Sequence, residues 1–330
     1  MEIKTRRTLR TLGYSASRSY YESEDPVKRT GVRREVDFLA TKLLKTLVLS
    51  NNFKVTFSLW LVGECKHSET HDYFAFKDEG DSLPLEVVDY PLRLDRIAVP
   101  PYQVTMGSLL RDYNFPFVME RMVEVDSRNA LAEGISGKQR LYDDARTFEA
   151  CESLTAACTD LRERFVNLWD RQRLQRMSNF RAEFTALARD MAGENPRTIV
   201  KKLVETHSEK LFKVFSPFAV TLLVPMMVLD DNRGLVETVL REDGSVSFDK
   251  EAEVVLYPFM SHKKPIDFLD APLPVMVCKH LSLPRAIQIV EVGTLKLIES
   301  VGREIENDPR SLIEESIIIQ IESDRRQNIF

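Results

Sequence analysis

Two copies of the tripeptide Cys-Lys-His are the first candidates for chemistry, because thiolates and imidazoles are ligands that zinc prefers. They are Cys65-Lys66-His67 and Cys278-Lys279-His280, and each follows an apolar run. Residues i and i+2 of a strand project to the same side, so each copy would present one sulfur and one imidazole together. The copies lie far apart in the chain, and nothing in the sequence brings them together. We therefore predict neither a metal site nor a cofactor.

Glu64-Cys65-Lys66 also matches one half of a metal-dependent nuclease site. In such a site a carboxylate holds Mg²⁺ and the lysine stabilises the charge that develops on the phosphate. The missing half is an aspartate supplied beside the metal by a neighbouring strand. The upstream acid, Asp37, falls within a predicted helix, and the adjacent Asp230 and Asp231 would point to opposite faces of a strand. The sequence therefore favours a solvated strand end.

Other catalytic patterns are incomplete. The stretch Gly134–Gln139 (GISGKQ) resembles a phosphate loop, but its spacing is too short and Gln139 replaces the hydroxyl that binds Mg²⁺. None of the five histidines stands beside an identifiable nucleophile and acid. His207 lies on an apolar helical stripe, where a hydrogen-bonded core histidine is expected. These observations favour a protein that is not an enzyme.

The N-terminal segment is basic, with no acidic residue from Ile3 to Tyr21. Its apolar residues Leu9 and Leu12 are too few to bury a face, so the entropy cost of ordering should exceed the gain from packing. We predict an extended arm over residues 1–30, held in place by another molecule. The residues expected to bind that partner are Arg6, Arg7, Arg10, Tyr14, Arg18, Tyr20 and Tyr21.

Composition limits the class of protein. The chain has 330 residues, of which 43% are hydrophobic, enough for a core and about two domains. Its net charge of −5 excludes a uniformly basic nucleic-acid binder, and no apolar run reaches the ~18 residues of a membrane span. Four scattered cysteines favour a reducing compartment. We expect a cytoplasmic protein, or one within an intracellularly assembled particle, without a membrane partner.

Periodicity predicts the elements that would position these residues. Apolar residues from Val32 to Leu47 recur at helical spacing, whereas residues 53–62 alternate as in a strand. Residues 142–191 contain neither Pro nor Gly and predict one very long helix, or two with a break near Gln172–Gln175. Two further helices are predicted, one beginning at Asn195-Pro196 and one spanning 284–306, and Asp243-Gly244 predicts a turn. The further predicted strands are 85–88, 94–99, 218–229, 236–241, 246–248, 253–259 and 316–321.

These elements predict an α+β fold: a sheet-containing body, a long helix or helical hairpin in the middle and a β-rich C-terminal half. The predicted segments are the arm (1–30), an α/β segment with Pro-rich strands and turns (31–133), a helical segment (134–215), and a β-meander with a C-terminal helix and strand (216–330).

The expected function is that of a non-enzymatic assembly subunit of a larger complex, such as a virion-like or tail-like particle, docking through its arm. Its partners would be other protein subunits, in a homo-oligomer or a multi-protein assembly. One alternative is nucleic-acid binding through the arginines and tyrosines of the arm. The other is a metal-dependent enzyme that uses the loop from Glu64 to Asp72.

Overall fold

The computed structural model of the chain describes most of its helices and strands. The described residues are 1–24, 31–48, 54–67, 72–78, 92–93, 121–125, 145–178, 181–190, 193–215, 219–259, 273–307, 313, 317, 318 and 321.

A mixed sheet runs through the middle of the molecule in the strand order β1-β2-β3-β7-β11-β10. The first three strands pair antiparallel, β3, β7 and β11 run parallel, and β10 returns antiparallel. The parallel strands β3, β7 and β11 therefore end at the same edge. The bounds are β1 Ser15–Glu24, β2 Gly31–Val48, β3 Lys54–Lys66, β7 Ala219–Leu229, β10 Val254–Phe259 and β11 Leu273–Lys279, and the short β5 (Leu92–Arg93) also pairs with β7.

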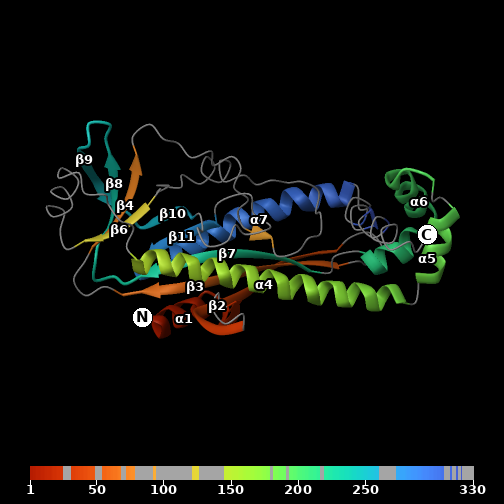
Figure 1. The fold of residues 1–330 in the computed structure, drawn as a ribbon, viewed down its shortest axis with the longest axis horizontal. Coiled ribbons are helices and arrows are strands. Elements are labelled where there is room, and N and C mark those ends of the chain that lie inside the picture. The colour runs from red at the N-terminus through yellow and green to blue at the C-terminus, as the bar shows by residue number, and fades with distance from the viewer. Residues whose placement is uncertain are drawn as a thin grey trace.

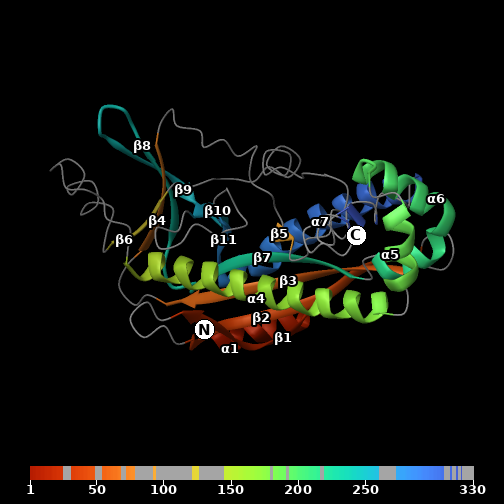
Figure 2. The same cartoon turned by 45° about the vertical axis from the view of Figure 1, so that its right-hand side comes forward.

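Helices cover both faces of this sheet (Figure 1). One apolar cluster joins α4 (Ala145–Ser178) to one face, and another joins α1 (Glu2–Thr11) and α7 (Leu283–Asn307) to the opposite face. The second cluster also takes in α5 (Arg181–Asp190) and α6 (Pro196–Phe215), which Figure 2 shows at one end of the long axis.

A second sheet, β6-β4-β8-β9, lies at the other end of the long axis (Figure 1). Its strands are β4 (Asp72–Asp78), β6 (Arg121–Val125), β8 (Leu235–Leu240) and β9 (Val246–Glu251). The predicted hairpin at Asp243-Gly244 is confirmed, because Gly244 adopts a φ of 79° between β8 and β9. Only a residue without Cβ adopts that backbone conformation readily.

The α+β class is confirmed, because helices combine with mixed sheets. The predicted arrangement, with a long central helix and a β-rich C-terminal half, does not match the structure well. Long strands also lie in the N-terminal part, where β2 has 18 residues and β3 has 13. The predicted segment boundaries stay a prediction. None of the helices in the described part of the chain is long and apolar enough to cross a membrane.

The helix predicted from Val32 to Leu47 is wrong, because this segment is strand β2. Phe38 and Ala40 are buried in the core, whereas Leu43, which a helical stripe would bury, is 62% exposed. The pairing of β2 with β1 is irregular around Asp37, and its pairing with β3 is irregular around Leu44. Each irregularity interrupts the two-residue alternation, so the apolar residues recur at steps that imitate a helix.

Several other elements agree with the prediction. The strand at 53–62 is β3, the run at 218–229 is β7, and the strand at 253–259 is β10. The helix at 284–306 is α7, and α6 begins after Asn195, whose side chain accepts a hydrogen bond from the N–H of Arg197 at 2.9 Å. The long helical segment is two helices, with the boundary between Ser178 and Arg181 rather than near residue 175.

The strand predicted at 316–321 is wrong, since the described residues of this stretch are helical. Ile313, Ile317 and Ile321 are buried in the core at a spacing of four residues, which suits one face of a helix. The strands predicted at 85–88 and 94–99, and the loop Gly134–Gln139, lie outside the described residues.

The N-terminal segment also differs from the expected arm. Residues 2–11 form α1 and residues 15–24 form β1, the edge strand of the central sheet. Leu9, Tyr14 and Tyr21 are buried in the cores of the same chain. The expectation that this segment cannot pack on its own chain is therefore wrong. The reason is that pairing with β2 supplies backbone hydrogen bonds that composition alone does not reveal.

A contact between Phe38 and Gly63 fixes the register of β2 against β3 and leads to a prediction. The two residues are paired, and a Cβ at residue 63 would overlap the ring of Phe38. We expect Gly63→Ala to destabilise the fold by about 1–3 kcal/mol through overpacking. Gly193→Ala is the control, because a Cβ there meets nothing within 4 Å, and it should stay within about 0.5 kcal/mol of wild type. Equal urea midpoints for the two variants would contradict the prediction.

Candidate active site

The register of β2 and β3 brings the carboxylate of Asp37 to the end of β3. Phe38 pairs with Gly63, so Asp37, the preceding residue of β2, lies beside Glu64 and Cys65. Its Oδ2 accepts a hydrogen bond of 2.6 Å from the N–H of Cys65. On the other side, β2 carries one residue more than β1 between Val36 and Leu39. Such a bulge redirects a side chain at a functional position of a strand.

Two carboxyl groups share this position. Burial, together with the negative charges of Asp37 and Glu2, raises the pKa of Glu64 to about 8 despite the lowering effect of Lys66. Burial also raises the pKa of Asp37, although the hydrogen bond from Cys65 acts in the opposite direction. The charge of Asp37 is among the causes that raise the pKa of Glu64, so the two carboxyl groups lie close to each other. Ionising both therefore costs free energy unless a cation lies close to them.

Lys66 and Glu2 complete the charged surroundings. Lys66 follows Glu64 by two residues on the same strand, so both side chains start from the same face of β3. Glu2 comes from the first turn of α1, where Arg18 contacts its carboxylate at 3.1 Å and Arg6 at 3.6 Å. Arg6 also donates to the backbone oxygen of Asp37 at 2.7 Å, which ties α1 to this end of β2.

The residues present fit a divalent metal ion. Carboxylate oxygens are the ligands that Mg²⁺ and Mn²⁺ prefer, and Asp37 with Glu64 supplies them from adjacent strands. In the described part of the chain no group of three or more His, Cys, Asp or Glu residues is placed to hold a metal. Mg²⁺ is commonly bound through one or two carboxylates, with water and substrate phosphate as its other ligands.

The sequence identified Glu64 and Lys66 but not their partner. Asp37 was excluded because the segment was predicted to be a helix, and the strand β2 removes that reason. The apolar residues beside Asp37 pack on both faces of the sheet, with Val36 in one core cluster and Phe38 and Ala40 in the other, so no alternation on a single face indicated a strand here.

The two Cys-Lys-His tripeptides lie at the same edge of the sheet but do not touch. Cys65 and Cys278 are both paired with Val228 of β7, which separates them by two strand spacings, roughly 10 Å. Burial raises the pKa of Cys65 to about 12 and also raises that of Cys278, so both thiols disfavour the thiolate that zinc needs.

The two histidines of these tripeptides face different aspartates. His67 contacts Asp230, whereas the Nδ1 of His280 lies 3.3 Å from the carboxylate of Asp231. The Nε2 of His280 is also 3.2 Å from the hydroxyl of Thr8 in α1. Each imidazole is therefore engaged by its own acid.

Most of the residues expected to bind a partner are engaged within the chain. Tyr14 donates to Glu291 at 2.8 Å, Arg10 donates to the backbone oxygen of Ala16, and Arg18 contacts Glu2 and Glu35. Tyr21 is buried, and Arg6 contacts Asp37 as described. Arg7 and Tyr20 are exposed.

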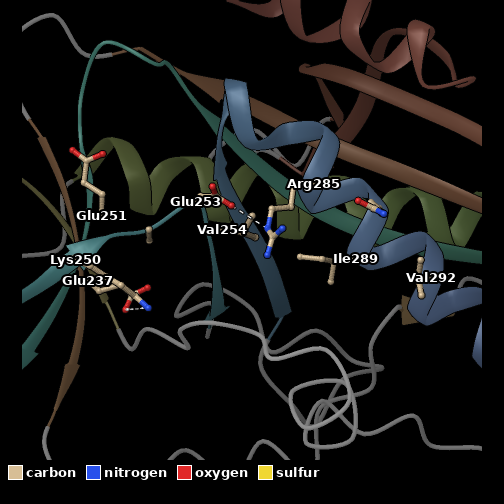
Figure 3. A pocket seen from close by; sticks show the side chains of 10 residues that line it. Glu237, Lys250, Glu251, Glu253, Val254, Arg285, Ile289 and Val292 are labelled. Carbon is tan, nitrogen blue, oxygen red and sulfur yellow. Dashed lines mark ion pairs between the residues drawn. The ribbon is translucent and has the colours of Figure 1, made fainter.

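A separate cavity of about 510 Å³ lies between α7 and the strands β8 to β10 (Figure 3). Four of its charged side chains form two ion pairs: Arg285 lies 3.0 Å from Glu253, and Lys250 lies 4.0 Å from the buried Glu237. Neither Asp37 nor Glu64 lines it. The cavity therefore belongs to a different part of the molecule from the carboxylate pair.

Comparisons with models of known protein families, with curated proteins and with solved structures find no match. The interpretation of the site therefore depends on its own geometry and chemistry.

The raised pKa of Glu64 predicts a pH-dependent cost to stability. In the folded protein this carboxyl keeps its proton up to about pH 8, whereas its ordinary pKa is 4.5. The folded state then binds more protons than the unfolded state in this window, so stability falls as pH rises from 4.5 through 8. We expect Glu64→Gln, in the presence of a chelator, to be more stable than wild type at pH 9 by on the order of 1–2 kcal/mol.

Thermal denaturation at pH 5 and at pH 9 measures this effect. The two proteins should differ little at pH 5, because Glu64 then carries its proton. Glu299→Gln, on the exposed surface of α7, is the control and should show no such dependence. A gain for Glu64→Gln that is the same at both pH values would contradict the prediction.

Proposed function

We propose that the protein is a divalent-metal-dependent nuclease that hydrolyses phosphodiester bonds at the end of β2 and β3. The observation that carries the proposal is the hydrogen bond from the N–H of Cys65 to the Asp37 carboxylate, which places Asp37 beside Glu64 on the neighbouring strand. It supplies the aspartate that the segment Glu64-Cys65-Lys66 lacks in the sequence. Two carboxylates and a lysine on adjacent strands are the residue types that this chemistry uses.

Each residue has a distinct role in this proposal. Asp37 and Glu64 would hold Mg²⁺ or Mn²⁺, which when bound supplies a Lewis acid for a phosphoryl oxygen and lowers the pKa of a bound water. Lys66 contributes a positive charge where negative charge develops on the phosphate. Hydrolysis forms a bond from the oxygen of water to phosphorus and breaks the ester bond, and the departing oxygen takes up a proton.

The assembly function loses its main support. It depended on an N-terminal segment that could not pack on its own chain, and α1 and β1 pack there. Binding to other protein subunits stays a prediction. Binding to nucleic acid, the alternative drawn from the same arginines, is part of the nuclease proposal, because a nuclease must bind its substrate.

Nuclease activity is tested by incubating the purified protein with plasmid DNA, single-stranded DNA and RNA, with Mg²⁺ or Mn²⁺ and with a chelator. We expect metal-dependent cleavage that falls by at least about 100-fold in each of the variants Asp37→Asn, Glu64→Gln and Lys66→Ala.

Two controls match these variants. Lys54→Ala removes an exposed lysine from the opposite end of β3, and Glu299→Gln removes an exposed carboxylate from α7. Both should cleave like wild type. The function is wrong if no substrate is cleaved with either metal, or if cleavage survives in the three site variants.

Metal binding can be measured without any substrate. A ligand that binds only the folded state raises its stability by RT ln(1 + [L]/Kd), or about 2.7 kcal/mol at 100 times Kd. Mg²⁺ or Mn²⁺ should therefore raise the melting temperature of wild type. The double variant Asp37→Asn/Glu64→Gln should lose this shift. Calorimetric titration gives the same comparison, and an unchanged shift in the double variant would place the metal elsewhere.

A further inference from the structure

Helix α1 has an inner and an outer face of different character. Thr5 and Leu9 are buried against the sheet, whereas the side chains of Lys4, Arg7 and Arg10 are exposed. These three residues follow one another at i, i+3 and i+6, so they form a single stripe on the helix. The rise of 1.5 Å per residue spaces them about 4.5 Å apart along the axis. The outer face of α1 is therefore a short row of cations.

The charges of this row are not cancelled within the described part of the chain. No carboxylate there forms an ion pair with Lys4 or Arg7. Arg10 donates to the backbone oxygen of Ala16, which leaves its positive charge intact. Arg6 differs from the other three, because it faces inward to the backbone of Asp37 and to Glu2. The stripe thus carries about three positive charges toward solvent.

The same helix touches the carboxylate site. Arg6 contacts the backbone of Asp37, and the hydroxyl of Thr5 lies 3.5 Å from the sulfur of Cys65. Glu2 in its first turn raises the pKa of both Asp37 and Glu64 through its charge. Figures 1 and 2 both show the N-terminal end of α1 close to the arrowhead of β3. The cationic row lies on the outer face of the same helix, one helix diameter (~10 Å) from these contacts, a distance that a strand extending beyond the cut phosphate can span.

We propose that Lys4, Arg7 and Arg10 form a docking surface for the phosphate backbone of the nucleic acid that is cleaved at Asp37 and Glu64. The inference deepens the proposed nuclease function and rests on it. A substrate strand extends beyond the phosphate that is cut, and lysines and arginines that neutralise the flanking phosphates supply most of its non-specific affinity. The surface excludes Arg6, Tyr14, Arg18 and Tyr21, which contact other parts of the chain.

Equilibrium binding in the presence of a chelator tests this surface without cleavage. The probe is a fluorescently labelled single-stranded DNA oligonucleotide, and anisotropy gives its affinity at several salt concentrations. For single strands the slope of log K against log salt is about −0.7 per phosphate contact. We expect the double variant Lys4→Ala/Arg7→Ala to lose about 1.4 of this slope and to bind at least about 10-fold more weakly at low salt.

Two further variants sharpen the comparison. Arg197→Ala/Lys201→Ala removes two exposed cations from one face of α6 and should leave the slope and the affinity unchanged. Lys4→Glu/Arg7→Glu should weaken binding more than the alanine pair, since it adds repulsion. Alanine favours helix, and neither side chain makes an ion pair in the described part of the chain, so α1 should stay folded. Far-ultraviolet circular dichroism checks this.

The outcomes separate this surface from the nuclease function. An unchanged slope in Lys4→Ala/Arg7→Ala, with cleavage still abolished by Asp37→Asn, would overturn the surface and leave the function standing. Weakened binding in that variant, with no cleavage by wild type, would support the surface and overturn the function. Absence of salt-dependent binding by wild type would overturn the surface. A loss of affinity that is equal in the α6 control would also overturn it.

Discussion

The pairing of Phe38 with Gly63 is the constraint on which the candidate site depends. The aromatic ring occupies the space that a side chain at residue 63 would fill, so β2 and β3 pack in one register. A shift by a single residue would turn Asp37 to the opposite face of the sheet. The bulge against β1 at the same point adds the extra residue beside Asp37. A packing contact in the core thus determines which carboxylates meet at the edge.

The buried carboxyl pair of the site lowers the stability of the folded protein. Burial and the charge of Glu2 raise the pKa of both Asp37 and Glu64, and the pKa of about 8 for Glu64 keeps that carboxyl protonated at neutral pH. Burying two carboxylates beside Lys66 costs folding free energy, and an apolar or amide pair at the same place would cost less. The arrangement makes sense if a divalent cation replaces the proton. This reasoning favours a functional role over a structural one.

Much of the fold followed from local sequence patterns, whereas strand β2, which supplies Asp37 to the site, did not. The alternation in β3, the Asp243-Gly244 turn and the Asn195 cap are signals confined to a few residues, and each predicted its element correctly. The strand β2 was predicted as a helix, because its bulges respond to pairing partners that a single segment does not reveal. Glu64 and Lys66 could therefore be found from sequence, whereas their meeting with Asp37 depends on long-range pairing.

The N-terminal segment is a second case in which long-range pairing could not be predicted from the sequence. Its composition correctly indicated an excess of positive charge, but an apolar count could not reveal that β2 would pair with it and that the core would accept Leu9 and Tyr14. Packing then divides the basic residues into two groups. Arg6 and Arg18 hold the site-facing side of α1 in place through Glu2, Glu35 and the backbone of Asp37. Because those contacts pair Arg6 and Arg18 with carboxylates of the chain, Lys4 and Arg7 are cations that form no ion pair within the described part of the chain.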